Sequence, residues 1–181
     1  MPIFLRSAFL LLLKQGTTID DNFKTTIMKE TKRIKKTFES IYTGTPWLEI
    51  TLADTLKDIT AAQAAKKASE NVNSIWEITN HIISWRKNIL QRVNGEVPET
   101  PDHNYFLPVT DTSDEAWQKT LLALEGSQHQ WISFLKEVKK EDFTNIHPRG
   151  NYSYYDLIQG IMQHDVYHLG QIVLLAKHFT S

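Results

Sequence analysis

The sequence predicts an all-α protein, a four-helix bundle with a long crossover between helices 2 and 3. Three observations lead to this prediction. Apolar residues recur at helical spacing in four long segments, glycine and proline fall mostly between those segments, and one long connection carries three prolines. The chain of 181 residues has the length of one domain. Because four amphipathic helices in one domain must bury their apolar stripes against one another, a bundle is expected.

The first long helix is expected to end near Tyr42, because Gly44-Thr45-Pro46 follows it. One of its faces is apolar, with Ile27, Ile34, Phe38 and Ile41. Another face is basic, with Lys29, Lys32, Arg33 and Lys36. A short helix follows, with apolar residues at positions 52, 56 and 59. Thr60 and Gln63 then have the spacing of a capping box that opens another short turn.

The other three long helices are marked by their first residues and apolar stripes. Ser74 and Glu77 form a capping box before the second helix, which stops at Asn94-Gly95. Its stripe is Ile75, Ile78, Ile82, Trp85, Ile89 and Val93. Thr112 and Glu115 are expected to cap the third helix. Its stripe is Trp117, Leu121, Leu124, Gln128, Trp131, Leu135 and Val138, a four-three repeat. The fourth helix follows Ser153 and Asp156 and runs from about Tyr154 to Phe179.

The connection between Gly95 and Thr112 contains Pro98, Pro101 and Pro108, so it should be mostly extended. At about 3.3 Å per residue, such a segment can travel the length of a bundle. The connection therefore predicts that helices 2 and 3 run parallel.

Composition excludes several classes of function. Twenty Lys and Arg against 21 Asp and Glu leave a net charge of −1, without the basic excess typical of nucleic-acid binding. The chain has no cysteine, which excludes disulfides, thiolate nucleophiles and iron–sulfur clusters. Any metal ion must therefore be bound by carboxylates and by some of the seven histidines.

Residues 1–27 are expected to be an N-terminal extension, with residues 28–181 forming the domain and Met28 as an alternative start. Residues 7–13 are apolar but too few to span a bilayer of about 30 Å. They also make a poor signal peptide, because Lys14-Gln15-Gly16 stands where small residues are needed for cleavage. With no other apolar segment of membrane length, a cytoplasmic protein without membrane contact is expected.

Two histidines of the fourth helix occupy positions where the periodicity demands apolar side chains. The stripe reads Leu157, Ile161, His164, His168, Ile172, Leu175 and Phe179. The spacing of four places His164 and His168 one turn apart on one face, within reach of a single ion. His81 falls between Ile78 and Trp85 on the inward face of the second helix. Three histidines should therefore face the core.

Two interpretations of the three histidines remain open. They are either separately hydrogen-bonded core residues or a metal site whose three nitrogen ligands leave a position for water or substrate. Zinc, nickel, iron, cobalt and copper all accept neutral imidazole. Gln163, Asp165 and Gln171 are candidate acceptors that would fix the imidazole tautomers.

The remaining histidines and the aromatic residues have other expected places. His103 and His147 are expected at the surface, His129 lies beside the third stripe, and His178 lies near the chain end. Four tryptophans at or beside the stripes are expected in the core: Trp76, Trp85, Trp117 and Trp131. A substrate pocket could open at the helix ends near Trp47, Tyr152, Tyr154 and Tyr155.

The surroundings of the histidines resemble two signatures of the DinB/YfiT-like superfamily. Residues 74–86, around His81, resemble its second-helix signature, and residues 155–171, with His164 and His168, resemble its fourth-helix signature. Pro46-Trp47 before a Leu-rich helix is also typical, and the resemblance covers residues 28–179. It implies a four-helix bundle with a long crossover and often a homodimer. It also implies a divalent metal ion, commonly nickel or zinc, bound by the three histidines.

The resemblance leaves three functions open, because that superfamily includes thiol S-transferases and proteins described as metal-dependent hydrolases. The first is a metal-dependent enzyme that transfers a low-molecular-weight thiol to a small electrophilic substrate, which suits a chain without cysteine. The second is a hydrolase that uses metal-bound water; the stripes offer no carboxylate base for it. The third is a non-enzymatic, metal-binding stress-response protein whose basic first helix contacts an anionic partner. Tyr155, Tyr167 and His147 are candidate general bases.

Overall fold

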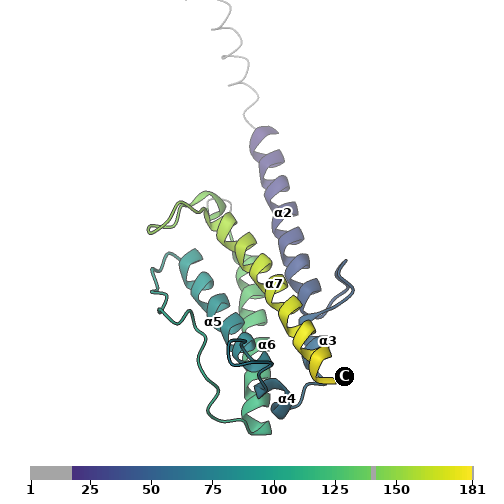
Figure 1. The fold of residues 1–181 in the computed structure, drawn as a ribbon. Helices are drawn as coiled ribbons and strands as arrows, with labels where there is room; N and C mark the ends of the chain where they lie inside the picture. The colour runs from purple at the N-terminus through teal and green to yellow at the C-terminus, as the bar shows by residue number, and fades with distance from the viewer. Residues whose placement is uncertain (1–17, 140–141, 181) are drawn as a thin grey trace, which may run out of the picture.

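The computed structural model describes residues 18–139 and 142–180 and consists of helices (Figure 1). The elements are α2 (Thr18–Tyr42), α3 (Leu52–Leu56), α4 (Ala61–Ala65), α5 (Ile75–Val93), α6 (Asp114–Glu137), the 3-10 helix η1 (Asp142–Thr144) and α7 (Tyr154–Thr180). Among the described residues there is no strand, and one isolated bridge pairs Ile146 with Ser153. The predicted all-α class is confirmed.

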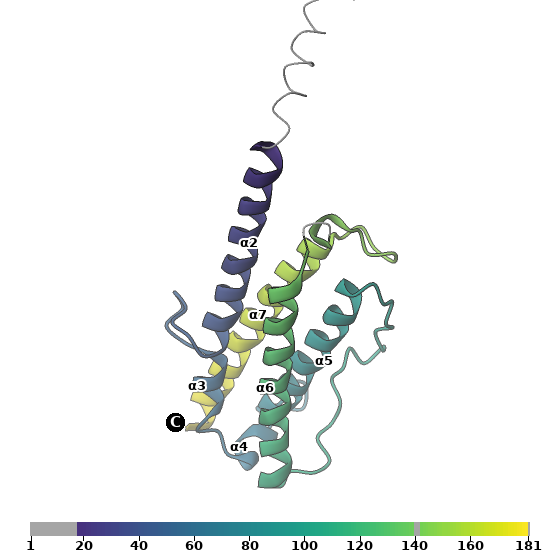
Figure 2. The ribbon, with the colours of Figure 1, turned by 180° about the vertical axis from the view of Figure 1, so that it is seen from behind.

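The four long helices form a bundle in which α5 and α6 run in the same direction. Figures 1 and 2 show α2 and α7 running the opposite way, and the segment between α5 and α6 returning along the bundle. The prolines keep that segment free of helix. It leaves the C-terminal end of α5 and returns to the level of its N-terminal end, where α6 begins. The predicted crossover is therefore confirmed.

Local capping decides where the long helices begin. The Ser74 hydroxyl accepts a hydrogen bond from the Glu77 N–H at 3.1 Å, and the Glu77 carboxylate accepts one from the Ser74 N–H at 2.8 Å, as predicted. The prediction that Thr112 caps the third helix is wrong by one residue. Ser113 is the cap, because the Asp111 carboxylate holds its N–H at 3.0 Å and its hydroxyl accepts the Ala116 N–H.

The core consists of two apolar clusters at opposite ends of the bundle. One gathers α3 and α4 against α5, α6 and α7, and the other gathers α2 and η1 against the same three long helices. Trp117 belongs to the first cluster and donates to the Ile59 carbonyl at 2.8 Å; Trp131 belongs to the second and donates to the Arg86 carbonyl at 3.1 Å. Trp76 is buried as expected, whereas Trp85, which was expected in the core, is only partly buried.

Polar residues separate the two clusters along α5 and α7. On α5, Ile82 belongs to one cluster and Ile89 to the other, and Arg86 lies between them at 1% exposure. On α7, Asp165 is likewise 1% exposed and lies between the two clusters. His164 and His168 on α7 therefore lie between the two clusters, whereas His81 on α5 lies between Ile78 and Ile82 of the first cluster.

The proposed domain boundary falls within a helix. α2 runs from Thr18 through Met28 without interruption, while residues 7–13 lie outside the described residues. Within the described part of the chain, no helix combines the length and the apolar character needed to cross a membrane.

Candidate metal centre

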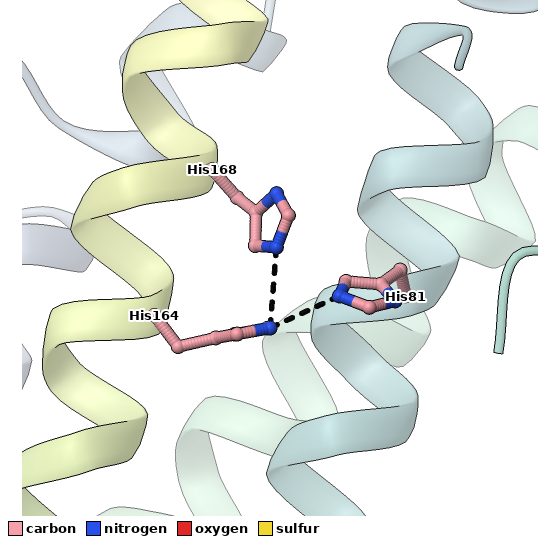
Figure 3. A group of neighbouring side chains, drawn as sticks. All are labelled: His81, His164 and His168. Atoms are coloured by element: carbon pink, nitrogen blue, oxygen red, sulfur yellow. Dashed lines mark hydrogen bonds between the residues drawn. The ribbon is translucent and has the colours of Figure 1, made fainter. Parts of the chain in front are cut away.

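The structure brings the three predicted histidines together. His164 and His168 point from α7 towards His81 on α5 (Figure 3). The Nε2 atom of His164 lies 3.0 Å from Nε2 of His81 and 3.2 Å from Nε2 of His168. One candidate ligand atom from each residue lies within 4.8 Å of the other two, so the group could hold a metal ion. His81 and His168 are buried, and His164 is partly exposed.

Hydrogen bonds at Nδ1 orient two of the imidazoles. The backbone carbonyl of Asn104 lies 2.7 Å from His81 Nδ1, and the side-chain oxygen of Gln171 lies 2.7 Å from His168 Nδ1. Both partners are acceptors, so each Nδ1 carries the proton and donates. In a neutral ring, Nε2 is then left with its lone pair. These outer partners thus aim the lone pairs of His81 and His168 at the centre.

The convergence of the three Nε2 atoms fits a metal ion. His164 Nε2 lies between two lone pairs, and a single proton on it can be donated to only one of them. A divalent cation accepts all three lone pairs at once. For zinc–nitrogen bonds of 2.0–2.1 Å in tetrahedral geometry, neighbouring ligand atoms are about 3.3 Å apart. The two Nε2 separations of 3.0 and 3.2 Å are close to that value.

Burial keeps two of the candidate ligands, His81 and His168, neutral. It lowers the pKa of His81 from 6.5 to about 4, against the opposing effect of the Asn104 hydrogen bond and with further lowering by the neighbouring His168 and His164. Burial also lowers the pKa of His168. At neutral pH both imidazoles therefore hold the lone pairs that metal binding requires.

The third candidate ligand, His164, has a buried carboxylate beside it. Nδ1 of His164 lies 4.0 Å from Oδ1 of Asp165, and neither buried atom has a hydrogen-bond partner among the described residues. The other oxygen of Asp165, Oδ2, lies 2.9 Å from both Nε and Nη2 of Arg86. Arg86 Nη1 donates to the Ser127 hydroxyl at 3.1 Å. Arg86 thus occupies Oδ2, and Oδ1 is left without a hydrogen bond at 4.0 Å from His164 Nδ1.

The crossover places two further residues at the site, Asn104 and Phe106, which the sequence analysis missed. Asn104 and Tyr105 both have positive φ, at 49° and 61°, which is uncommon outside glycine. This turn presents the Asn104 carbonyl to His81, while the Asn104 side chain accepts the Trp85 indole N–H at 3.0 Å. The Phe106 ring stacks on the His81 ring, with centroids 3.9 Å apart. A proline-rich segment gives no periodic signal from which these contacts could have been predicted.

A cavity of about 440 Å³ opens at the three histidines. The residues that line it with them are Asn73, Trp85, Asn104, Phe106, Tyr167 and Gln171. Among these described lining residues there is no carboxylate, lysine or arginine. Of the candidate bases, Tyr167 is at this cavity and its hydroxyl accepts a hydrogen bond from Gln171 at 3.1 Å, whereas Tyr155 donates to Glu30 instead.

The remaining predicted residues have varied positions. His103, His129 and His178 are exposed, and Gln163 is exposed rather than bonded to a ligand. The expectation that His147 lies at the surface is wrong. His147 is 4% exposed, because its loop folds against the end of α5 and places Nε2 3.0 Å from the Glu96 carbonyl.

Fold and site together define a class: an all-α crossover bundle with three histidines converging between α5 and α7. The chain belongs to the DinB superfamily, whose family model matches residues 49–172, more than half of the sequence. Searches of curated proteins and of solved structures gave no match.

Proposed function

We propose that this protein is a metal-dependent enzyme that transfers a low-molecular-weight thiol to a small electrophilic molecule. His81, His164 and His168 are its proposed metal ligands, with nickel or zinc as the ion. The observation that carries the proposal is the convergence of the three Nε2 atoms, two of them aimed by acceptors at Nδ1. A divalent ion held there would supply Lewis acidity that lowers the pKa of a thiol or water on its open side.

Three features of the chain's own residues shape the proposed site. Asn104 and Gln171 hold two of the proposed ligands in position, and the cavity opens at the three histidines. Phe106 covers one face of the His81 ring. The Tyr167 hydroxyl is the group at this cavity that can pass on a proton.

Hydrolysis is the alternative that the same ligands would allow. A hydrolase needs a base to take a proton from the attacking water, and a carboxylate near the metal is the usual choice. The cavity at the triad has no carboxylate among its described lining residues. A thiol needs no such base once its pKa has been lowered, so the lining favours thiol transfer.

Elemental analysis of untagged protein, after reconstitution with nickel or zinc, tests the site. We expect about one ion per chain in the wild type, and loss of that ion in His81→Ala and His168→Ala with the helical circular dichroism retained. His129→Ala is the matched control, because His129 is an exposed histidine on α6. A wild type that binds no metal, or a double variant His164→Ala/His168→Ala that keeps one tightly bound ion, would contradict the site.

Cobalt-substituted protein tests the chemistry. Addition of a small thiol should produce a sulfur-to-cobalt charge-transfer band in the wild type, because the thiol would take the open position as thiolate. A spectrum unchanged by millimolar thiol would contradict thiol transfer. The homodimer stays a prediction, which light scattering coupled to size exclusion measures, and the cytoplasmic location stays a prediction as well.

A further inference from the structure

A second, larger cavity adjoins the candidate metal centre. It has a volume of about 700 Å³, and Trp85 and His164 line both cavities. Its size lies within the range of about 300–1,000 Å³ typical of sites for small organic molecules. His164, one of the three converging histidines, is therefore part of the wall of the larger cavity.

The larger cavity is lined by apolar and aromatic side chains and by polar side chains that are mostly uncharged. Ile89, Leu157 and Ile161 supply aliphatic surface, and Trp85 and Tyr152 supply rings. Three of the polar side chains are amides: Asn151, Gln159 and Gln163. An aromatic or alicyclic ring would bury its surface here while its polar substituents reach the amides.

The charges around the larger cavity exclude one class of ligand. Asp156 is the one carboxylate among the described lining residues, and its Oδ2 already accepts from the Ser153 N–H at 2.9 Å and the Ser153 hydroxyl at 2.6 Å. No lysine or arginine is among the described residues that line either cavity. An anionic ligand would lose hydration without gaining a cationic partner, and it would lie near the negative charge of Asp156.

We propose that the larger cavity binds the body of the substrate and selects a molecule that is built on an aromatic ring and carries no negative charge. The word substrate rests on the function proposed above; the binding preference itself does not require a metal ion. The selection excludes carboxylates and phosphates, so the electrophile of the proposed reaction is an aromatic compound without an anionic group.

Gly160 offers a way to fill the cavity without disturbing the core. It lines the larger cavity, lies on an exposed position of α7, and a Cβ placed there meets no atom within 4 Å. Gly160→Phe should therefore fold and occupy the space with a ring, since replacing a helical glycine does not lower helix propensity. Gly170→Phe is the matched control: Gly170 is also exposed on α7 with open space at Cβ, and it does not line the larger cavity.

Calorimetric titration with two probes of equal size tests the proposal: 2-(2-naphthyl)ethanol, which is neutral, and 2-naphthylacetate, which is anionic. We expect the neutral probe to bind the wild type and Gly170→Phe at least about tenfold more tightly than the anionic probe. Gly160→Phe should weaken binding of the neutral probe by at least about tenfold. Equal affinity for both probes, no binding of the neutral probe, or unchanged binding in Gly160→Phe would each overturn the proposal.

The metal content of the same samples keeps this inference separate from the proposed function. A wild type that binds the neutral probe selectively but holds no metal after reconstitution would refute the metal-dependent enzyme and leave the cavity's preference standing. A wild type that holds one ion and fails to discriminate the probes would refute the preference and leave the metal site standing.

Discussion

The buried pair of Arg86 and Asp165 allows a sharp test of how the bundle supports the candidate site. Each side chain is 1% exposed, and two guanidinium nitrogens lie 2.9 Å from one carboxylate oxygen. Asp165→Leu leaves the guanidinium charge buried without its counter-ion. Breaking such a pair from one side typically costs about 3–5 kcal/mol. We therefore expect the free energy of unfolding of the metal-free protein to fall by about that amount.

Replacing both partners distinguishes the energetic effect of the buried charge from the effect of Asp165 on metal binding. Arg86→Met/Asp165→Leu removes both charges, and exchanging a buried pair for apolar residues is often neutral or stabilising by about 1–4 kcal/mol. The double variant should regain most of the stability lost in Asp165→Leu. Its metal affinity should nevertheless remain about 10–100-fold below wild type, because the carboxylate that lies 4.0 Å from His164 Nδ1, and that could orient this imidazole when a metal is bound, has been removed.

Urea denaturation in the presence of a chelator measures the first effect, and competition with a chromogenic chelator measures the second. An Asp165→Leu protein within about 1 kcal/mol of wild type would refute the energetic reasoning about the buried pair. A stable double variant with wild-type metal affinity would refute the role assigned to Asp165 at His164. The two results are independent of one another.

Two further predictions concern His81 and its backbone partner. Because the pKa of His81 is about 4 in the folded protein and 6.5 ordinarily, the unfolded chain binds more protons between these values. The free energy of unfolding of the metal-free protein, measured by urea denaturation, should therefore fall as pH falls from 6.5 to about 4. His81→Gln should reduce this dependence on pH. A wild-type stability that does not change over this pH range would contradict the prediction. At Asn104, with φ of 49°, the variants to glycine and alanine both lose the side-chain bond to Trp85. Asn104→Gly should be more stable than Asn104→Ala by about 1 kcal/mol, because only alanine retains the left-handed strain; equal denaturation midpoints would argue against strain at this turn.

Local patterns in the sequence were sufficient for the helices and for the faces they bury. The ends of α5, the stripe on α7 and the position of His81 depend on residues within a few turns of one another, and their spacing is visible in one dimension. The crossover could be predicted because a proline-rich segment of that length is extended and is long enough to run the length of the bundle. The error at Thr112 shows the limit of this reasoning: Thr112 and Ser113 are both good caps, and the Asp111 turn decided between them.

Only the tertiary structure decided what surrounds the three histidines. The Asn104 carbonyl reaches His81 from 23 positions away, and Arg86 reaches Asp165 from 79 positions away. Burial of His147 likewise depends on the Glu96 carbonyl in a distant loop. Spacing along one helix determined which imidazoles share a face, since that geometry repeats every turn. Their tautomers, the neighbouring charge and the cavities depend on segments brought together by chain folding, for which a single sequence carries no periodic signal.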